Sequence, residues 1–187
     1  EDGETRYGVA LENEKAVVTL PGGRKVTLGY EYRIAGADAL HLFMKKSLVR
    51  FNDWSTVDFG KDRYPEIENK VFHARLKESE WKDGALILRY GTPKESYAEY
   101  GNAEGYTLAI KPTPQDVRVR LSLKDKRATP FVEAGNMIFS VPEAKGPYVV
   151  EKCGREIDVE TDIVKDANHI LWAMDGYARI GNVKLAS

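Results

Sequence analysis

The histidines are the side chains of this sequence best suited to acid–base catalysis or metal binding. His41, His73 and His169 lie far apart along the chain. None forms a pair at positions i and i+4, and none accompanies a Cys-x-x-Cys motif, the spacings typical of zinc sites. The sequence therefore predicts no metal and no cofactor. His73 lies in a strand-like segment, and we interpret it as an ordinary residue on an exposed strand face.

Carboxylates are the second candidate, because glycoside hydrolysis uses two of them at a fixed separation. Glu66 with Glu68, and Glu133 with Asp158, are pairs that can be considered. The chain has 29 acidic residues, however, and spacing in the sequence gives no distance in space. No pair is chosen, so the catalytic residues stay unknown at this level.

Aromatic residues in polar segments offer a different chemistry, the stacking of a flat ring on the apolar face of a sugar. One tryptophan lies in a long polar stretch (52–68) and another lies beside a turn. Several tyrosines lie in a Gly- and Glu-rich segment (96–106). Neighbouring acids could accept hydrogen bonds from sugar hydroxyls. The alternative interpretation is that the rings cap the edges of a β-sandwich. The predicted carbohydrate-binding residues are Trp54, Trp81, Tyr97, Tyr100, Asp53 and Asp58.

Composition excludes several classes of protein. The 28 basic and 29 acidic residues nearly cancel, so no strong field would attract nucleic acid or an anionic membrane. Cys153 is the only cysteine, so no internal disulfide can form, and we interpret it as a turn or strand-end residue. No segment approaches the roughly 20 apolar residues of a membrane span. We expect neither nucleic acid nor membrane as a partner.

The elements that would position these residues are strands. Every second residue of 117–124 (VRVRLSLK) is apolar, which is typical of a strand with one packed and one exposed face. Residues 37–48 fit a helix or a strand equally well, and 161–165 could form one helical turn. Strands are expected at 7–11, 16–20, 25–32, 71–77, 86–90, 106–110, 117–124, 137–141, 148–151, 170–174 and 177–185.

Many short strands separated by turn signals predict an all-β fold. We expect an antiparallel β-sandwich, supersandwich or jelly-roll-like, with at most one or two short helices. A chain of 187 residues suits one such domain, so residues 1–187 are predicted to form a single domain. Both ends look like strands, which suggests a fragment of a longer polypeptide.

One block, residues 129–176, carries short motifs in a specific order. The order resembles the distal β-sandwich, related to galactose mutarotase, of α-mannosidase-like bacterial glycoside hydrolases. The block is about a quarter of the chain. The motifs are FVEA at 131–134, IF at 138–139, KCG at 152–154, IDV at 157–159, DAN at 166–168, Leu171, Ala173 and DG at 175–176.

The resemblance departs from the family pattern in two ways. Ile170 and Trp172 stand where paired histidines are expected, and the zinc-binding catalytic barrel of the family is absent from these residues. The resemblance therefore implies an accessory domain, transfers no catalytic residue, and suggests a periplasmic or extracellular location in a bacterium.

The first hypothesis is a non-catalytic β-sandwich of a carbohydrate-active system, which supports a glycoside hydrolase or binds glycan through its loop aromatics. Its expected partners are carbohydrate and a neighbouring catalytic domain. One alternative is a stand-alone mutarotase- or lyase-like sugar enzyme that uses a histidine and a glutamate as acid and base. Another is a structural interaction module, marked by a large exposed apolar patch.

Overall fold

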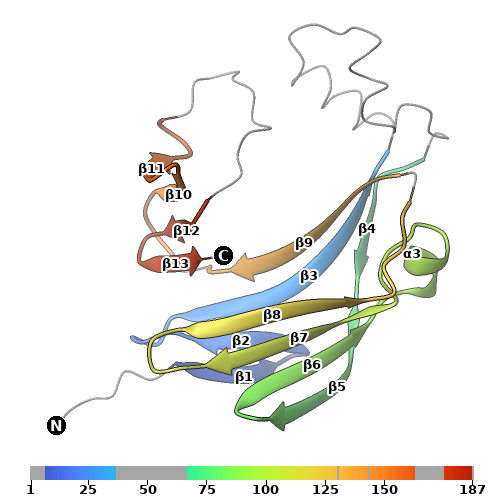
Figure 1. Ribbon diagram of the computed structural model, residues 1–187, viewed down its shortest axis with the longest axis horizontal. Helices are drawn as coiled ribbons and strands as arrows, with labels where there is room; N and C mark the ends of the chain where they lie inside the picture. The colour runs from blue at the N-terminus through green and yellow to red at the C-terminus, as the bar shows by residue number, and fades with distance from the viewer. Residues whose placement is uncertain (1–6, 37–66, 130, 143, 163–174, 187) are drawn as a thin grey trace, which may run out of the picture. The chain divides into compact units, whose positions relative to one another are not determined.

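The computed structural model describes residues 7–36, 67–129, 131–142, 144–162 and 175–186 (Figure 1). In this part of the chain, thirteen strands and one short helix form three antiparallel sheets, so the predicted all-β class is confirmed. The chain divides into two compact units, of which the first ends at Val141 and the second holds the strands after it. That residues 1–187 act as a single domain stays a prediction.

The first sheet of the first unit is built around one long strand, β3 (Lys25–Ala35). Strand β9 (Val132–Ser140) pairs with residues 27–35 along one edge of β3. The other edge is shared, because β2 (Lys15–Thr19) pairs with residues 25–28 and β4 (Lys70–His73) pairs with residues 31–34. Strand β1 (Gly8–Glu12) extends the sheet beyond β2.

The second sheet has the order β5-β6-β7-β8, with β5 at Arg75–Lys82, β6 at Ala85–Gly91, β7 at Gly105–Pro112 and β8 at Val117–Lys124. The β5–β6 hairpin turns at Asp83 and Gly84, whose positive φ angles of 50° and 74° suit a tight type I′ turn. A bulge interrupts β5 between Leu76 and Glu78. The short helix α3 (Lys94–Ala98) lies in the connection from β6 to β7.

The two sheets enclose the core of the first unit. Alternate residues of the central strands point inward, as expected for strands with one packed face. The rings of Tyr30 on β3 and Tyr106 on β7 join the sheets, with centroids 5.0 Å apart. The inward-facing residues of β3, β6 and β7 are Val26, Leu28, Tyr30, Tyr32, Ile34, Leu86, Leu88, Tyr90, Tyr106, Leu108 and Ile110.

The second unit contains a four-stranded sheet of order β11-β10-β12-β13. Its strands are β10 (Tyr148–Lys152), β11 (Arg155–Asp158), β12 (Tyr177–Ile180) and β13 (Val183–Ala186). Cys153 lies in the β10–β11 turn with φ 51°, which confirms its interpretation as a turn residue. Its N–H donates to Asp175 Oδ2 at 2.6 Å.

Two predicted strands are each two strands in the structure. The segment 71–77 is split at Ala74, where the chain leaves β4 in the first sheet and enters β5 in the second. The segment 177–185 is split by a turn at Gly181, with φ 57°. The sequence prediction missed β11 and helix α3. The ambiguous segment 37–48 and the strand predicted at 170–174 lie outside the described residues.

Candidate functional site

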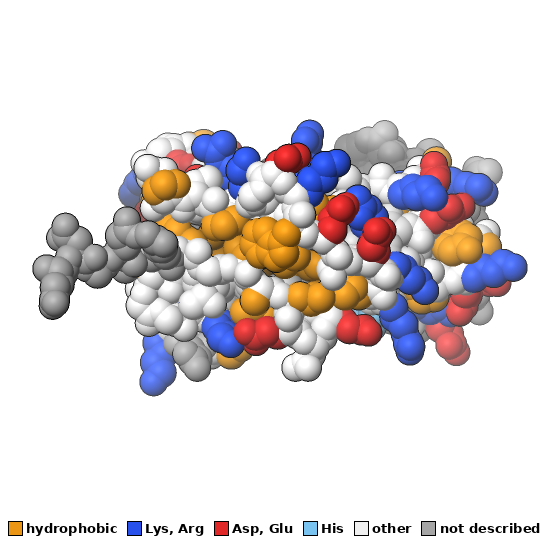
Figure 2. All heavy atoms as spheres, turned by 90° about the horizontal axis from the view of Figure 1, so that it is seen from below, with side chains coloured by type: hydrophobic (Ala, Val, Ile, Leu, Met, Phe, Trp, Pro, Cys, Tyr) orange, Lys and Arg blue, Asp and Glu red, His pale blue; other side chains and the backbone are white. Residues whose placement is uncertain are grey.

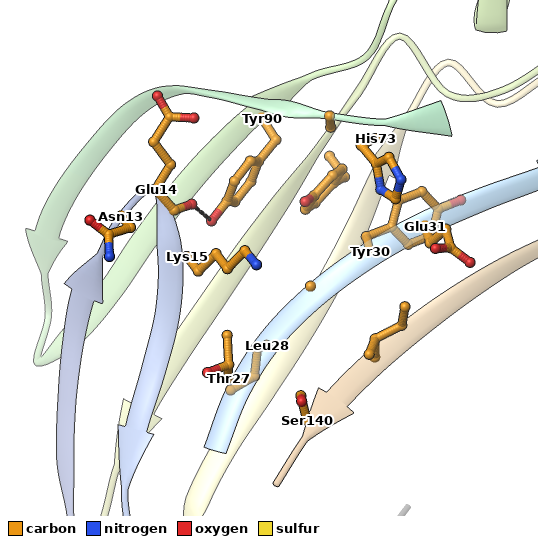
Figure 3. Close-up of a pocket in the computed structure, with 14 residues that line it drawn as sticks. Asn13, Glu14, Lys15, Thr27, Leu28, Tyr30, Glu31, His73, Tyr90 and Ser140 are labelled. Atoms are coloured by element: carbon orange, nitrogen blue, oxygen red, sulfur yellow. Dashed lines mark hydrogen bonds between the residues drawn. The ribbon is translucent and has the colours of Figure 1, made fainter. Parts of the chain in front are cut away.

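A cleft of about 390 Å³ opens at the shared edge of β3 (Figure 3). Strand β2 pairs with β3 only as far as Leu28, and β4 begins its pairing at Glu31. Within the described residues, Gly29 and Tyr30 therefore have no ladder partner on this edge. The cleft enters the sheet at this interruption, so the side chains of both sheets contribute to its lining.

Local features of the sequence explain the interruption. Strand β2 begins directly after a tight turn at Asn13 and Glu14, whose φ angles are 50° and 63°, so β2 cannot extend further along β3. Strand β4 stops at His73 because the chain must cross at Ala74 to begin β5 in the other sheet. The two neighbours of β3 thus end on either side of a gap.

Three tyrosine rings form the floor of this cleft. Tyr90 and Tyr106 stack with centroids 4.6 Å apart and an interplanar angle of 12°, and Tyr106 also contacts Tyr30. The Tyr90 hydroxyl donates to the backbone carbonyl of Glu14 at 3.0 Å, which ties the turn of one sheet to a strand of the other. The rings are at most 8% exposed, so the floor is closely packed.

Polar groups lie around this floor. Glu31 is only 8% exposed, and its carboxylate is ion-paired with the guanidinium of Arg33. His73 stands directly opposite Glu31 in the β3–β4 register, so both side chains lie on the same face of the sheet, opposite to the face on which Tyr30 points inward. Figure 3 shows the Lys15 side chain extending into the cleft, whereas the Glu14 carboxylate points away.

Burial keeps the tyrosine hydroxyls protonated. Burial, and secondarily the charge of Glu14, raises the pKa of Tyr90 to about 12. Burial also raises the pKa of Tyr106, with smaller contributions from Tyr90 and Tyr30, while a backbone hydrogen bond with Tyr30 opposes them. At neutral pH these groups are therefore uncharged hydrogen-bonding hydroxyls.

Alkaline pH is expected to destabilise the fold through these tyrosines. Because the folded-state pKa of Tyr90 lies above its ordinary value of about 10, its contribution is complete below pH 10 and is lost as the pH rises through 12. The free energy of unfolding, measured by urea titration across this range, should fall less steeply with pH in Tyr90→Phe than in the wild type. Identical slopes would contradict this expectation.

The aromatic residues predicted to bind carbohydrate do not form one surface. Trp81 lies at the β5–β6 hairpin and is 58% exposed, whereas Tyr97 lies in α3 and Tyr100 follows it, at the other end of β6. A strand of seven residues separates these ends by roughly 20 Å. Trp54, Asp53 and Asp58, like His41 and His169, lie outside the described residues.

Tyr100 contributes to packing. Its ring contacts Phe72 and Phe131, with centroids at 5.6 and 5.4 Å, and the Lys70 ammonium lies 4.8 Å from its centroid. Trp81 is freer. Figure 2 shows a band of apolar side chains flanked by charged ones on the face seen from below. Among the described residues of the first unit, the large apolar side chains that are exposed are Leu11, Val71, Trp81, Leu123 and Ile138.

Two of the four carboxylates considered from the sequence have structural partners. Glu133 accepts a hydrogen bond from the Tyr32 hydroxyl and lies 2.8 Å from Lys126 Nζ. Burial, followed by this bond to Glu133, raises the pKa of Tyr32. Asp158 in the second unit accepts from the backbone N–H of Glu160 at 2.9 Å. Glu68 is exposed, and Glu66 is outside the described residues.

The sequence interpretation missed most of the cleft. Tyr30, Tyr90 and Tyr106 follow the period-two pattern of core residues, and only the strand pairing shows that they meet at a gap. Within the described ranges, no group of three or more His, Cys, Asp or Glu residues could hold a metal ion. Nor does any helix there have the length and apolar character to cross a membrane.

Comparisons with protein-family models, with curated proteins and with solved structures each found no match to this chain.

Proposed function

We propose that this chain is a non-catalytic β-sandwich module of a carbohydrate-active system and that it binds a sugar in the cleft at the edge of β3. The observation that carries the proposal is the lining of this cleft, which combines three buried tyrosines from three strands with a carboxylate, an imidazole and an ammonium group around the gap in the sheet. The role as an accessory to a glycoside hydrolase rests on the resemblance of residues 129–176.

The size and chemistry of the cleft suit a sugar. A volume of about 390 Å³ lies within the range of roughly 300–1,000 Å³ typical of small-molecule sites. Ile138, which is 38% exposed, offers apolar contact to the C–H groups of a sugar ring. Glu31 can accept hydrogen bonds from its hydroxyls, and Lys15 can donate to them. A few polar groups on an apolar floor fix both the orientation and the specificity of such a ligand.

His73→Ala should weaken sugar binding about fivefold, because it removes one polar contact worth about 1 kcal/mol. The residue is exposed, so the fold should be retained. The measurement is calorimetric titration of a panel of neutral mono- and disaccharides against the wild type and the variant. Trp81→Ala is the matched control, because it removes the exposed aromatic residue at a different place and should leave the affinity unchanged.

Two outcomes would count against the cleft. Absence of binding by every sugar of the panel would reject the proposed function. Loss of binding in Trp81→Ala with none in His73→Ala would move the site to the β5–β6 hairpin.

One observation favours a sugar enzyme as the second candidate. His73 and Glu31 are partners in the β3–β4 register and both line the cleft, and a histidine beside a carboxylate can act as an acid–base pair. Polarimetry distinguishes the two functions. A binding module leaves the interconversion of sugar anomers at its uncatalysed rate, whereas an enzyme of this kind accelerates it and loses the acceleration in Glu31→Gln.

A further inference from the structure

The outer face of the second sheet carries a row of cations on β7 and β8. Residues of these strands that alternate with the core residues point away from the core. The β7–β8 register places Lys111 directly opposite Arg118, with Arg120 and Lys124 further along the same face of β8. All four are exposed. We refer to Lys111, Arg118, Arg120 and Lys124 as the cationic strip.

The cationic strip is only partly paired, through two long and exposed ion pairs. The nearest carboxylate oxygens lie 3.7 Å from Arg118 Nε, on Asp116, and 3.8 Å from Lys124 Nζ, on Glu104, both beyond hydrogen-bond distance. The two basic side chains are 76% and 71% exposed. Lys111 and Arg120 have no ion pair among the residues that the structure describes. The strip therefore keeps an excess of positive charge, with two carboxylates beside four cations.

The other half of the same outer face is different. Arg89 on β6 is held by Glu80 at 2.6 Å and by Glu78 at 3.3 Å, both on β5. These ion pairs compensate the charge of Arg89, so that Arg75 and Lys82, near the two ends of β5, are the other cations on this half of the face. The β7–β8 half carries four cations in two adjacent strands, although the net charge of the whole chain is −1.

The arrangement has an energetic cost within the fold. Like charges directly opposite each other on neighbouring strands are destabilising, and Lys111 and Arg118 are such a pair. Beside the strip, β7 presents only small side chains on this face, at Gly105, Thr107 and Ala109. Long cationic side chains therefore border a shallow floor that an extended ligand can approach. An anionic ligand would relieve the repulsion that Asp116 compensates only in part.

We propose that the cationic strip binds an anionic polysaccharide, a polyuronate or a sulfated glycan, laid along β8. Alternate residues of a strand are about 6.7 Å apart, so the strip presents charges at intervals along a line. That geometry is complementary to an extended polymer with repeating carboxylates or sulfates. The strip is separate from the sugar cleft and does not depend on it.

Nucleic acid is a poorer fit to the same surface. Four cations are fewer than the roughly six to ten phosphate contacts of a strong electrostatic complex. Proteins that bind single strands without sequence preference also stack bases on aromatic rings. The described residues of β7 and β8 that share this outer face include no aromatic side chain.

The test is titration of polygalacturonate and of heparin against the wild type and two double variants at low salt. Arg118→Gln with Arg120→Gln should weaken polysaccharide binding about fivefold, the size expected for two exposed ion pairs. Arg75→Gln with Lys82→Gln on β5 is the control, because it removes the same charge from exposed positions of the opposite edge strand. The control should change the affinity less than twofold.

Binding by the wild type should also weaken steeply as salt is raised, since about 1 M salt screens charges beyond roughly 3 Å. Equal losses in the two double variants would overturn the proposal, because only net charge would then matter. So would absence of binding to both polysaccharides, or tighter binding of single-stranded DNA. Neutral sugars should bind the strip variant as they bind the wild type, so failure of the strip and failure of the cleft are distinguishable.

Discussion

Replacing Leu108 with alanine is expected to destabilise the first unit by about 3 kcal/mol. Leu108 lies in the middle of β7 and is 1% exposed. In the register of the sheet it stands between Leu88 on β6 and Leu121 on β8. Truncation of a leucine at such a site removes buried apolar surface and leaves a cavity, which together cost about 2–5 kcal/mol. The measurement is urea unfolding followed by tryptophan fluorescence.

Leu123→Ala is the matched control for this variant. Leu123 lies on the neighbouring strand β8, on the same face of the sheet, but it is 44% exposed. The same chemical change at a half-solvated position should cost less than about 1 kcal/mol. Equal effects of the two substitutions would mean that the inner face of this sheet is not the core of the unit.

Gly105→Ala is expected to cost about 1–3 kcal/mol, the usual cost of overpacking. Gly105 opens β7 directly opposite Gly91 of β6, and a Cβ at Gly105 would collide with the backbone carbonyl oxygen of Tyr90. A backbone atom in a ladder can move aside only by distorting the pairing of two strands. Because Tyr90 and Tyr106 adjoin this position, the same variant should also weaken sugar binding.

Gly91→Ala offers a control at the other half of the same residue pair. A Cβ at Gly91 would come within 2.8 Å of Lys77 Cε, a methylene near the end of a flexible side chain that can rotate away. The cost should therefore be clearly smaller than that of Gly105→Ala. Thermal unfolding of both variants under one set of conditions gives the comparison, and a larger loss in Gly91→Ala would refute the assignment of the clash.

The local sequence pattern was sufficient to predict a strand that has one solvent-exposed and one packed face. Residues 117–124 alternate strictly, and β8 has those bounds in the structure. The Asp83-Gly84 pair was equally informative, because few residues other than glycine, asparagine and aspartate readily adopt the positive φ angles of a tight hairpin turn. Both features depend on residues close together in the sequence.

Features that depend on distant residues could not be predicted in this way. The segment 71–77 has a continuous strand pattern, but its two halves pair with different sheets, which local periodicity does not report. The cleft likewise depends on pairing between strands that are distant in the sequence. Tyr30, Tyr90 and Tyr106 look like ordinary core residues until the separate ends of β2 and β4 along β3 are known.

The predicted sugar-binding set shows a related limit. Trp81, Tyr97 and Tyr100 were grouped because they are aromatic residues in polar segments. The length of β6 separates the first from the other two. His73 lies exposed in β4, as the sequence predicts, and it also lines the cleft, which the sequence could not show.

The pairing of β3 with β9 has a consequence for the cotranslational folding of this protein. The two strands are roughly 100 residues apart in the chain, yet they share nine residue pairs. During synthesis, one edge of β3 stays unpaired until β9 has left the ribosomal exit tunnel, whereas the β5–β6 hairpin can form earlier. Long-range pairing of this kind slows maturation, and bare strand edges invite unwanted association. We therefore expect nascent chains truncated before β9 to require a chaperone that the finished protein does not.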